Sequence, residues 1–114
     1  MVGRVTNNCY ELNGYRYMIS ELIFAAKDEK LKPFELKVAD IFACYEAPNE
    51  NTLMSFIEHF KRVNEANLSF PIILSPDNVI LDGRHRLAKA IIEEKKYIKA
   101  MRFDKMPHIG EKIE

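Results

Sequence analysis

The sequence predicts an α+β domain in which helices flank a small mixed β-sheet. Pro71–Leu74 is a continuous apolar run, typical of a strand covered on both faces, and Val79–Leu81 returns antiparallel after the turn-forming stretch Ser75–Asn78. Two other segments repeat their apolar residues every three or four positions, as amphipathic helices do. One spans Leu53–Val63 and the other Arg84–Ile92. Together these segments predict strands and helices within one small fold.

Length and composition favour one soluble domain over residues 1–114. The chain is 47% hydrophobic, which is enough for a single core. Lys plus Arg and Asp plus Glu each total 17, whereas a dedicated nucleic-acid binder usually has a basic excess. We find no leader and no long apolar run, so we expect a cytoplasmic protein without a membrane partner. Cys9 and Cys44 match no metal-ligand pattern and are expected to stay thiols.

The N-terminal half shows weaker signals. Residues 1–12 have no clear period and are expected to form a loose arm, followed by a turn at Asn13-Gly14. An apolar stripe from Tyr17 to about Lys27 predicts the first helix. Alternation in Phe34–Ala39 predicts a half-buried strand, and Asp40–Cys44 can begin a short helical turn.

The remaining elements follow from turn residues and periodicity. Ala47–Asn51 is expected to be a loop, and Asn51 or Thr52 can cap the helix that follows. We expect the apolar side of that helix to face the core. Tyr97–Phe103 alternates and predicts the last strand, and residues 107–114 are expected to be a mobile tail.

The candidate functional site is the turn Asp82-Gly83-Arg84-His85-Arg86, where an apolar strand passes into a helix. The first helical N–H groups have no intrahelical partner, and the helix dipole favours an anion there. Gly83 suits positive φ or close approach by a ligand, and the next three residues supply charge-assisted donors. The alternative is a solvated basic turn capped by Asp82, but cations at a helix N-terminus oppose the dipole. We therefore predict a phosphate site.

Two further cations extend this predicted site. Lys89 follows on the same helix, and Arg62 lies with His59 on the polar face of the preceding helix. His59 and Arg62 can reach the same anion as the turn, or they can form a solvated surface pair. The expected phosphate ligands are Gly83, Arg84, His85, Arg86, Lys89 and Arg62.

Three carboxylates are candidates for proton transfer or metal binding. They are Asp82, Asp77 and Glu21, of which position supports Asp82 alone. Asp82 can cap the helix, hold a basic neighbour or act with His85 as a catalytic pair. No zinc, Walker or dinucleotide motif occurs in the sequence.

At this turn the chain resembles the ParB/sulfiredoxin-like superfamily, whose small domains carry Asp-Gly-x-His-Arg between a β-hairpin and a helix rich in Ala and Leu. The resemblance spans roughly residues 34 to 106, and the turn motif is its specific part. It implies a ParB/sulfiredoxin-like fold and a turn that holds nucleotide phosphates. ParB proteins carry Gly-Glu-Arg-Arg here and use it on the triphosphate of CTP; Gly83 and Arg86 match, whereas Arg84 and His85 differ.

Comparison with sulfiredoxin narrows the implied chemistry. Sulfiredoxin carries Gly-Cys-His-Arg, and Arg84 stands in the place of its reactive Cys, so we do not expect sulfinate reduction. The nearest pattern is Asp-Gly-His-His-Arg of small ParB-like domains, a group that includes free-serine kinases with nucleotide phosphoryl donors.

Three functional hypotheses follow. The first is a module that binds a nucleotide (ATP, ADP or CTP) or another phosphorylated ligand and acts through a partner protein or a homodimer. The second is a phosphotransferase or nucleotide hydrolase, in which Arg84 and Arg86 hold phosphates, His85 stabilises the transferred group, and Asp82 or Glu21 serves as base or Mg²⁺ ligand. The third is a DNA-associated ParB-like nuclease or partition factor, with a basic face formed by Lys61, Arg62, Arg84, Arg86 and Lys89.

Overall fold

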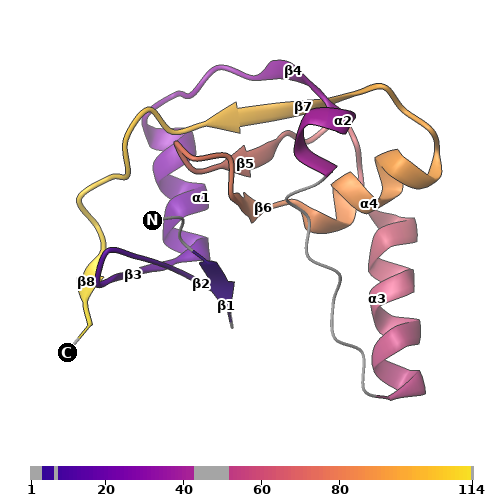
Figure 1. The fold of residues 1–114 in the computed structure, drawn as a ribbon, viewed down its shortest axis with the longest axis horizontal. Coiled ribbons are helices and arrows are strands. Elements are labelled where there is room, and N and C mark those ends of the chain that lie inside the picture. The colour runs from indigo at the N-terminus through magenta and orange to yellow at the C-terminus, as the bar shows by residue number, and fades with distance from the viewer. Residues whose placement is uncertain (1–3, 7, 43–51, 114) are drawn as a thin grey trace.

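The computed structural model describes residues 4–6, 8–42 and 52–113, which form an α+β fold (Figure 1). The elements in chain order are β1 (Arg4–Thr6), β2 (Cys9–Leu12), β3 (Tyr15–Met18), α1 (Ile19–Asp28), β4 (Phe34–Lys37), α2 (Val38–Phe42), α3 (Leu53–Glu65), β5 (Ile72–Leu74), β6 (Ile80–Asp82), α4 (Arg84–Ile92), β7 (Tyr97–Arg102) and β8 (Glu111–Lys112). Within these described ranges, the strands make two four-stranded sheets. The sequence predicted one.

The second sheet, in the order β4-β7-β5-β6, is the mixed sheet that the sequence predicted. β5 and β6 pair antiparallel, as expected for the hairpin, and β5 pairs parallel with β7. β7 also pairs antiparallel with β4 and therefore lies inside the sheet. All three residues of β5 are buried, which confirms that this strand is covered on both faces.

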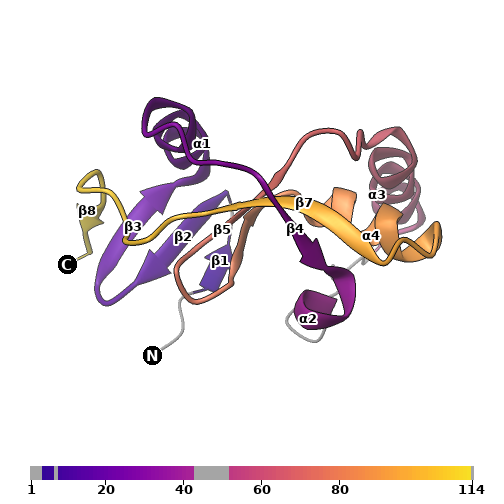
Figure 2. The ribbon, with the colours of Figure 1, turned by 90° about the horizontal axis from the view of Figure 1, so that it is seen from above.

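The two faces of this sheet belong to different cores. Ile72 and Leu74 of β5 pack with α2 and α4, whereas Ile73 packs with α1 and with β2 and β3. Figure 2 shows the same division, with α1 on one side of the β5–β7 strands and α4 on the other. Because successive residues of a strand point to opposite faces, three consecutive apolar residues are needed to serve both cores.

The first sheet, in the order β1-β2-β3-β8, corrects two expectations about the N-terminus. Residues 4–6 and 9–12, expected to belong to a loose arm, are strands, and Tyr10 is fully buried. The first helix begins at Ile19 rather than Tyr17, because Tyr17 belongs to β3. Asn13 and Gly14 both have positive φ, the conformation of a tight β-hairpin turn. The Asn-Gly signal therefore marked a hairpin.

The C-terminal residues also differ from expectation. Residues 107–114 were expected to form a mobile tail, but β8 pairs antiparallel with β3, so β7 is not the last strand. Gly110 lies against the ring of Tyr17, where a Cβ would come within 2.7 Å of a ring carbon. Strand β8 has only two residues, which is too short for an alternation of apolar and polar residues to be recognised in the sequence.

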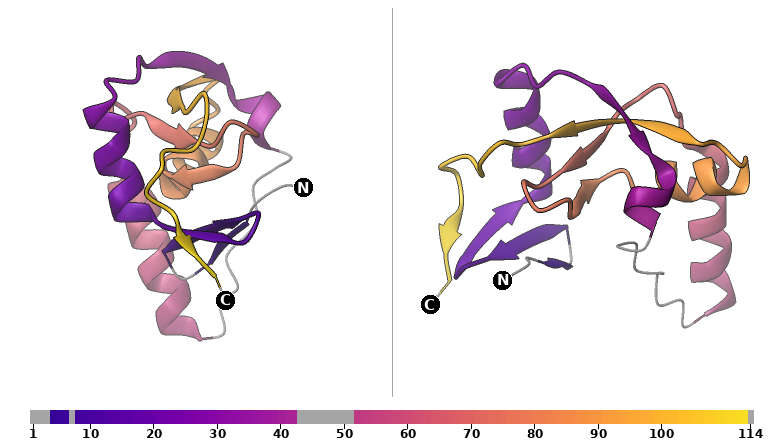
Figure 3. Two further views of the ribbon diagram at one scale, coloured as in Figure 1. Left: turned by 90° about the vertical axis from the view of Figure 1, so that its left-hand side faces the viewer. Right: turned by 45° about the horizontal axis from the view of Figure 1, so that its top comes forward.

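Helix α3 contradicts the prediction that its apolar side faces the core. Val63 is its buried residue, and large apolar side chains before it are exposed. α3 packs mainly on α4 and stands at one edge of the molecule, as Figures 1 and 3 show. Its predicted cap is confirmed, since Thr52 Oγ1 accepts a hydrogen bond from the Ser55 N–H at 3.0 Å.

Three smaller expectations complete the comparison. The helical turn expected over Asp40–Cys44 is α2, Val38–Phe42, while Cys44 and the expected loop Ala47–Asn51 lie outside the described residues. Cys9 is a free thiol. Within the described ranges, no helix is both long and apolar enough to cross a membrane.

Candidate functional site

The predicted phosphate turn lies between β6 and α4. Gly83 is the N-cap of α4 with φ 108°, which confirms the expected positive φ. The Leu87 N–H donates to the Gly83 carbonyl at 3.0 Å and closes the first helical turn. No side chain of the described residues forms a cap hydrogen bond at this end of α4. Asp82 therefore does not cap the helix, as the hypothesis of a solvated basic turn had required. The N–H groups of the first turn therefore keep their anion-binding capacity.

Gly83 is required by the packing of this turn on β5. A Cβ at Gly83 would lie 2.5 Å from Cγ2 of Ile72, which is fully buried. The left-handed φ would strain any other residue as well. Gly83 thus lets the chain turn from β6 into α4 while it packs closely on β5. A side chain at this position would point toward Ile72 and not toward a ligand.

Arg86, expected to be a phosphate ligand, is committed to the fold. Its Nη1 donates to the Pro71 carbonyl at 2.9 Å and lies 3.5 Å from Asp82 Oδ2. The side chain is 22% exposed, and its guanidinium lies 5.9 Å from the centre of the Phe70 ring. Arg86 therefore ties α4 to the entry of β5, and Asp82 holds a basic neighbour.

Lys89 is also engaged elsewhere. Its Nζ donates to the carbonyls of Asn64 at 2.9 Å and Ala66 at 2.7 Å, at the C-terminal end of α3. A cation there satisfies carbonyls that have no intrahelical partner and complements the helix dipole. Lys89 therefore joins α3 to α4, and the structure does not direct it to the turn.

His85 faces α3. Its ring centre lies 4.9 Å from that of His59, and the two rings are tilted by 50°. Burial lowers the pKa of His85, and the nearby His59, Arg62 and Arg84 lower it further. The structure thus places His59 and Arg62 beside the turn, which is one of the two arrangements expected from the sequence. The basic groups create a positive potential around His85.

One carboxylate acts in the opposite direction. Asp82 raises the pKa of His85, but this carboxylate is also the ion-pair partner of Arg86. Arg84 forms no hydrogen bond or ion pair within the described ranges. The net result is a partly buried imidazole among basic groups beside an uncapped helix N-terminus, an arrangement that favours an anion.

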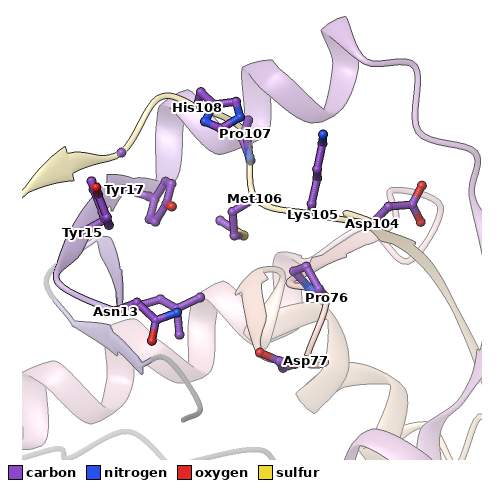
Figure 4. Close-up of a pocket in the computed structure, with 12 residues that line it drawn as sticks. Asn13, Tyr15, Tyr17, Pro76, Asp77, Asp104, Lys105, Met106, Pro107 and His108 are labelled. Atoms are coloured by element: carbon purple, nitrogen blue, oxygen red, sulfur yellow. The ribbon is translucent and has the colours of Figure 1, made fainter.

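A separate cleft of about 630 Å³ is lined by Pro76 and Asp77, among other residues (Figure 4). These two residues precede β6, whereas Gly83 follows it. The cleft is formed by the β2–β3 turn, the β5–β6 turn and the segment after β7. Met106 lies at its centre, between Tyr17 and Pro76. Its polar lining includes Asn13, Asp77, Asp104, Lys105 and His108. These residues come from three distant segments, so the sequence contained no local signal for the cleft.

The two other candidate carboxylates lie away from the turn. Asp77 lines the cleft of Figure 4. Glu21 is exposed on α1 and lines a shallow depression with Phe24 and Ile109. Neither is placed to act on an anion at the N-terminus of α4.

Comparisons of this chain with protein families, curated proteins and solved structures give no match.

The conformation and packing of Gly83 lead to a prediction about stability, for which Gly14 provides a matched control. Gly83→Ala combines a strained φ with a clash against Ile72, whereas Gly14→Ala has φ 81° and no atom within 4 Å of its Cβ. We expect Gly14→Ala to lower the free energy of unfolding by about 1 kcal/mol from backbone strain. Gly83→Ala should lose about 1–3 kcal/mol more through overpacking. Urea unfolding measures both; equal losses would show that Ile72 yields without cost.

Proposed function

We propose that this protein binds the phosphate groups of a nucleotide, or of another phosphorylated ligand, at the N-terminus of α4. The first-turn N–H groups, Arg84 and His85 contact the phosphate, and Arg62 approaches from α3. ATP, ADP and CTP are the candidate nucleotides. The proposal agrees with what the resemblance to the ParB/sulfiredoxin-like superfamily implies, with a narrower set of ligands.

The observation that carries this proposal is the electrostatic environment of His85. The His85 ring is partly buried and its centre lies 4.9 Å from that of His59. Burial lowers the pKa of His85, and His59, Arg62 and Arg84 lower it further. Such an arrangement adds nothing to stability by itself, and a helix N-terminus makes it less favourable. A bound anion reverses each of these interactions, because it attracts the cations and accepts from the first-turn N–H groups.

Neighbouring basic residues have different roles in this proposal. Arg84 forms no hydrogen bond or ion pair within the described part of the chain, so it can engage a ligand without breaking the fold. Arg86 and Lys89 instead hold Pro71 and the end of α3 in place. They position the site and are not expected to be principal phosphate ligands.

Isothermal titration with pyrophosphate, ATP and CTP tests the assignment. Arg84→Ala should weaken binding by roughly tenfold to a hundredfold, the range expected when one charge-assisted hydrogen bond is lost. Its melting temperature should match that of the wild type. Arg16→Ala removes the same charge from the first sheet, where Arg16 pairs with Glu11, and should leave the affinity unchanged.

Arg86→Ala provides the contrast in this experiment. Loss of its bonds to Pro71 and Asp82 should lower the free energy of unfolding by about 1.5–3 kcal/mol, unlike the loss of Arg84. If Arg84→Ala binds each phosphate probe as tightly as the wild type, the phosphate site is wrong.

The lowered pKa of His85 predicts how binding depends on pH. A bound anion stabilises the imidazolium and raises this pKa, so binding takes up a proton and strengthens as the pH falls. Sulfate is the suitable probe, because its own charge does not change in this range. Its affinity should increase from about pH 8 to about pH 6. His85→Asn should remove most of the increase; an unchanged pH profile in that variant would exclude His85 as the group that titrates.

A second candidate function, phosphoryl transfer or nucleotide hydrolysis, depends on Asp82, which precedes Gly83 in the same turn and raises the pKa of His85. A carboxylate beside an imidazole at a phosphate site can share in proton transfer. Mg²⁺ with ATP or CTP should then release phosphate, and Asp82→Asn should abolish release while binding persists. If the protein binds the nucleotide but releases no phosphate, the enzymatic function is excluded and the binding function remains. The DNA-associated alternative has less support, because the formal net charge is zero.

A further inference from the structure

Helix α3 carries an exposed apolar face that the proposed phosphate site does not use. Leu53, Phe56 and Phe60 are 75%, 55% and 61% exposed, and Met54 and Ile57 are about half exposed or more. The Phe56 and Phe60 rings are stacked with centres 6.4 Å apart. A cluster of large apolar side chains of this kind marks an interaction surface on a soluble domain.

The face lies where a partner can reach it. α3 stands at the edge of the molecule beside α4, and its N-terminal half extends beyond the sheets in Figures 1 and 3. Its inward side is marked by Val63 and by His59, which contacts His85. At about 100° per residue, Leu53, Ile57 and Phe60 fall on one outward stripe. The stripe is straight and short, as needed to pack against another helix.

We propose that this face of α3 packs antiparallel against the same face of a second copy of the chain. The charge pattern favours a second copy. Glu58 and Lys61 lie three residues apart on the exposed edge of the stripe. A twofold axis that crosses the helices between them brings Lys61 of each copy beside Glu58 of the other, and so forms two ion pairs.

The same charges argue against other occupants. α3 carries two acidic residues, Glu58 and Glu65, and two basic residues, Lys61 and Arg62. A helix that lies on an anionic membrane, or that tracks nucleic acid, has a clear excess of Lys and Arg on its polar side. An edge of α3 that carries equal numbers of acidic and basic residues suits a protein surface with the complementary arrangement of charges. The α3 helix of a second copy has this arrangement.

The area of the face sets the expected strength. Five large apolar side chains, half to three-quarters exposed, offer roughly 500 Å² in each copy and roughly 1,000 Å² in a twofold interface. That total is at the lower end of specific interfaces, so the dimer should be weak and depend on concentration. We expect a dissociation constant in the micromolar range.

Sedimentation velocity across concentrations from about 1 μM to several hundred μM tests the proposal. The wild type should shift from monomer to dimer. Phe60→Glu should remain a monomer at every concentration, because it places charges at the centre of the interface. Phe24→Glu is the matched control. Phe24 is an aromatic residue on α1 that is even more exposed than Phe60, at 72% against 61%, and its replacement should leave the dimer intact.

Charge exchange tests the antiparallel arrangement. Glu58→Lys and Lys61→Glu should each weaken the dimer about tenfold or less, as exposed ion pairs allow, and the double exchange should restore it. Because both residues are exposed, circular dichroism should show the same helix content in all variants. A wild-type chain that stays monomeric at every concentration, or a dimer that survives Phe60→Glu, would overturn the proposal. Single exchanges that leave the dimer unchanged would overturn its antiparallel geometry.

Discussion

The close packing of Gly83 on Ile72 is the constraint on which the rest of the structure depends. With φ 108° and no Cβ, Gly83 lets the chain leave β6 and start α4 directly against β5. The helix then buries Leu87 and Ala90 in the core that Ile72 shares. It also follows that the first turn of α4, with its unpaired N–H groups, is held at a fixed place at the end of the hairpin.

From this fixed start, the helical period gives two successive basic residues, His85 and Arg86, different environments. Arg86 turns toward the entry of β5 and bonds to Pro71, whereas His85 turns toward His59 of α3. Steps of about 100° separate them, so a run of basic residues is divided between a structural and an electrostatic role. The basic groups around His85 disfavour its charged form, and this unfavourable interaction is the physical basis of the proposed anion site.

Helix α3 connects this site to the outer surface. Lys89 holds its C-terminal carbonyls, His59 approaches the phosphate turn, and its apolar stripe faces outward. A helix can have regularly spaced apolar residues that remain exposed. The spacing shows that these residues share one face of the helix, but it does not show whether that face is covered. The same helix therefore lies beside the turn on one side and exposes its apolar stripe on another.

The sequence by itself determined the α+β class, the β5–β6 hairpin, a helix cap at Asn51 or Thr52, and the positive φ of Gly83. The last three depend on residues that are neighbours in the chain. It also located the basic turn. Only the tertiary structure decided that β1, β2, β3 and β8 form a separate sheet, that Arg86 and Lys89 bond to carbonyls, and that the apolar side of α3 is exposed. These outcomes depend on contacts between residues far apart in the chain, and neither periodicity nor local motifs contain that information.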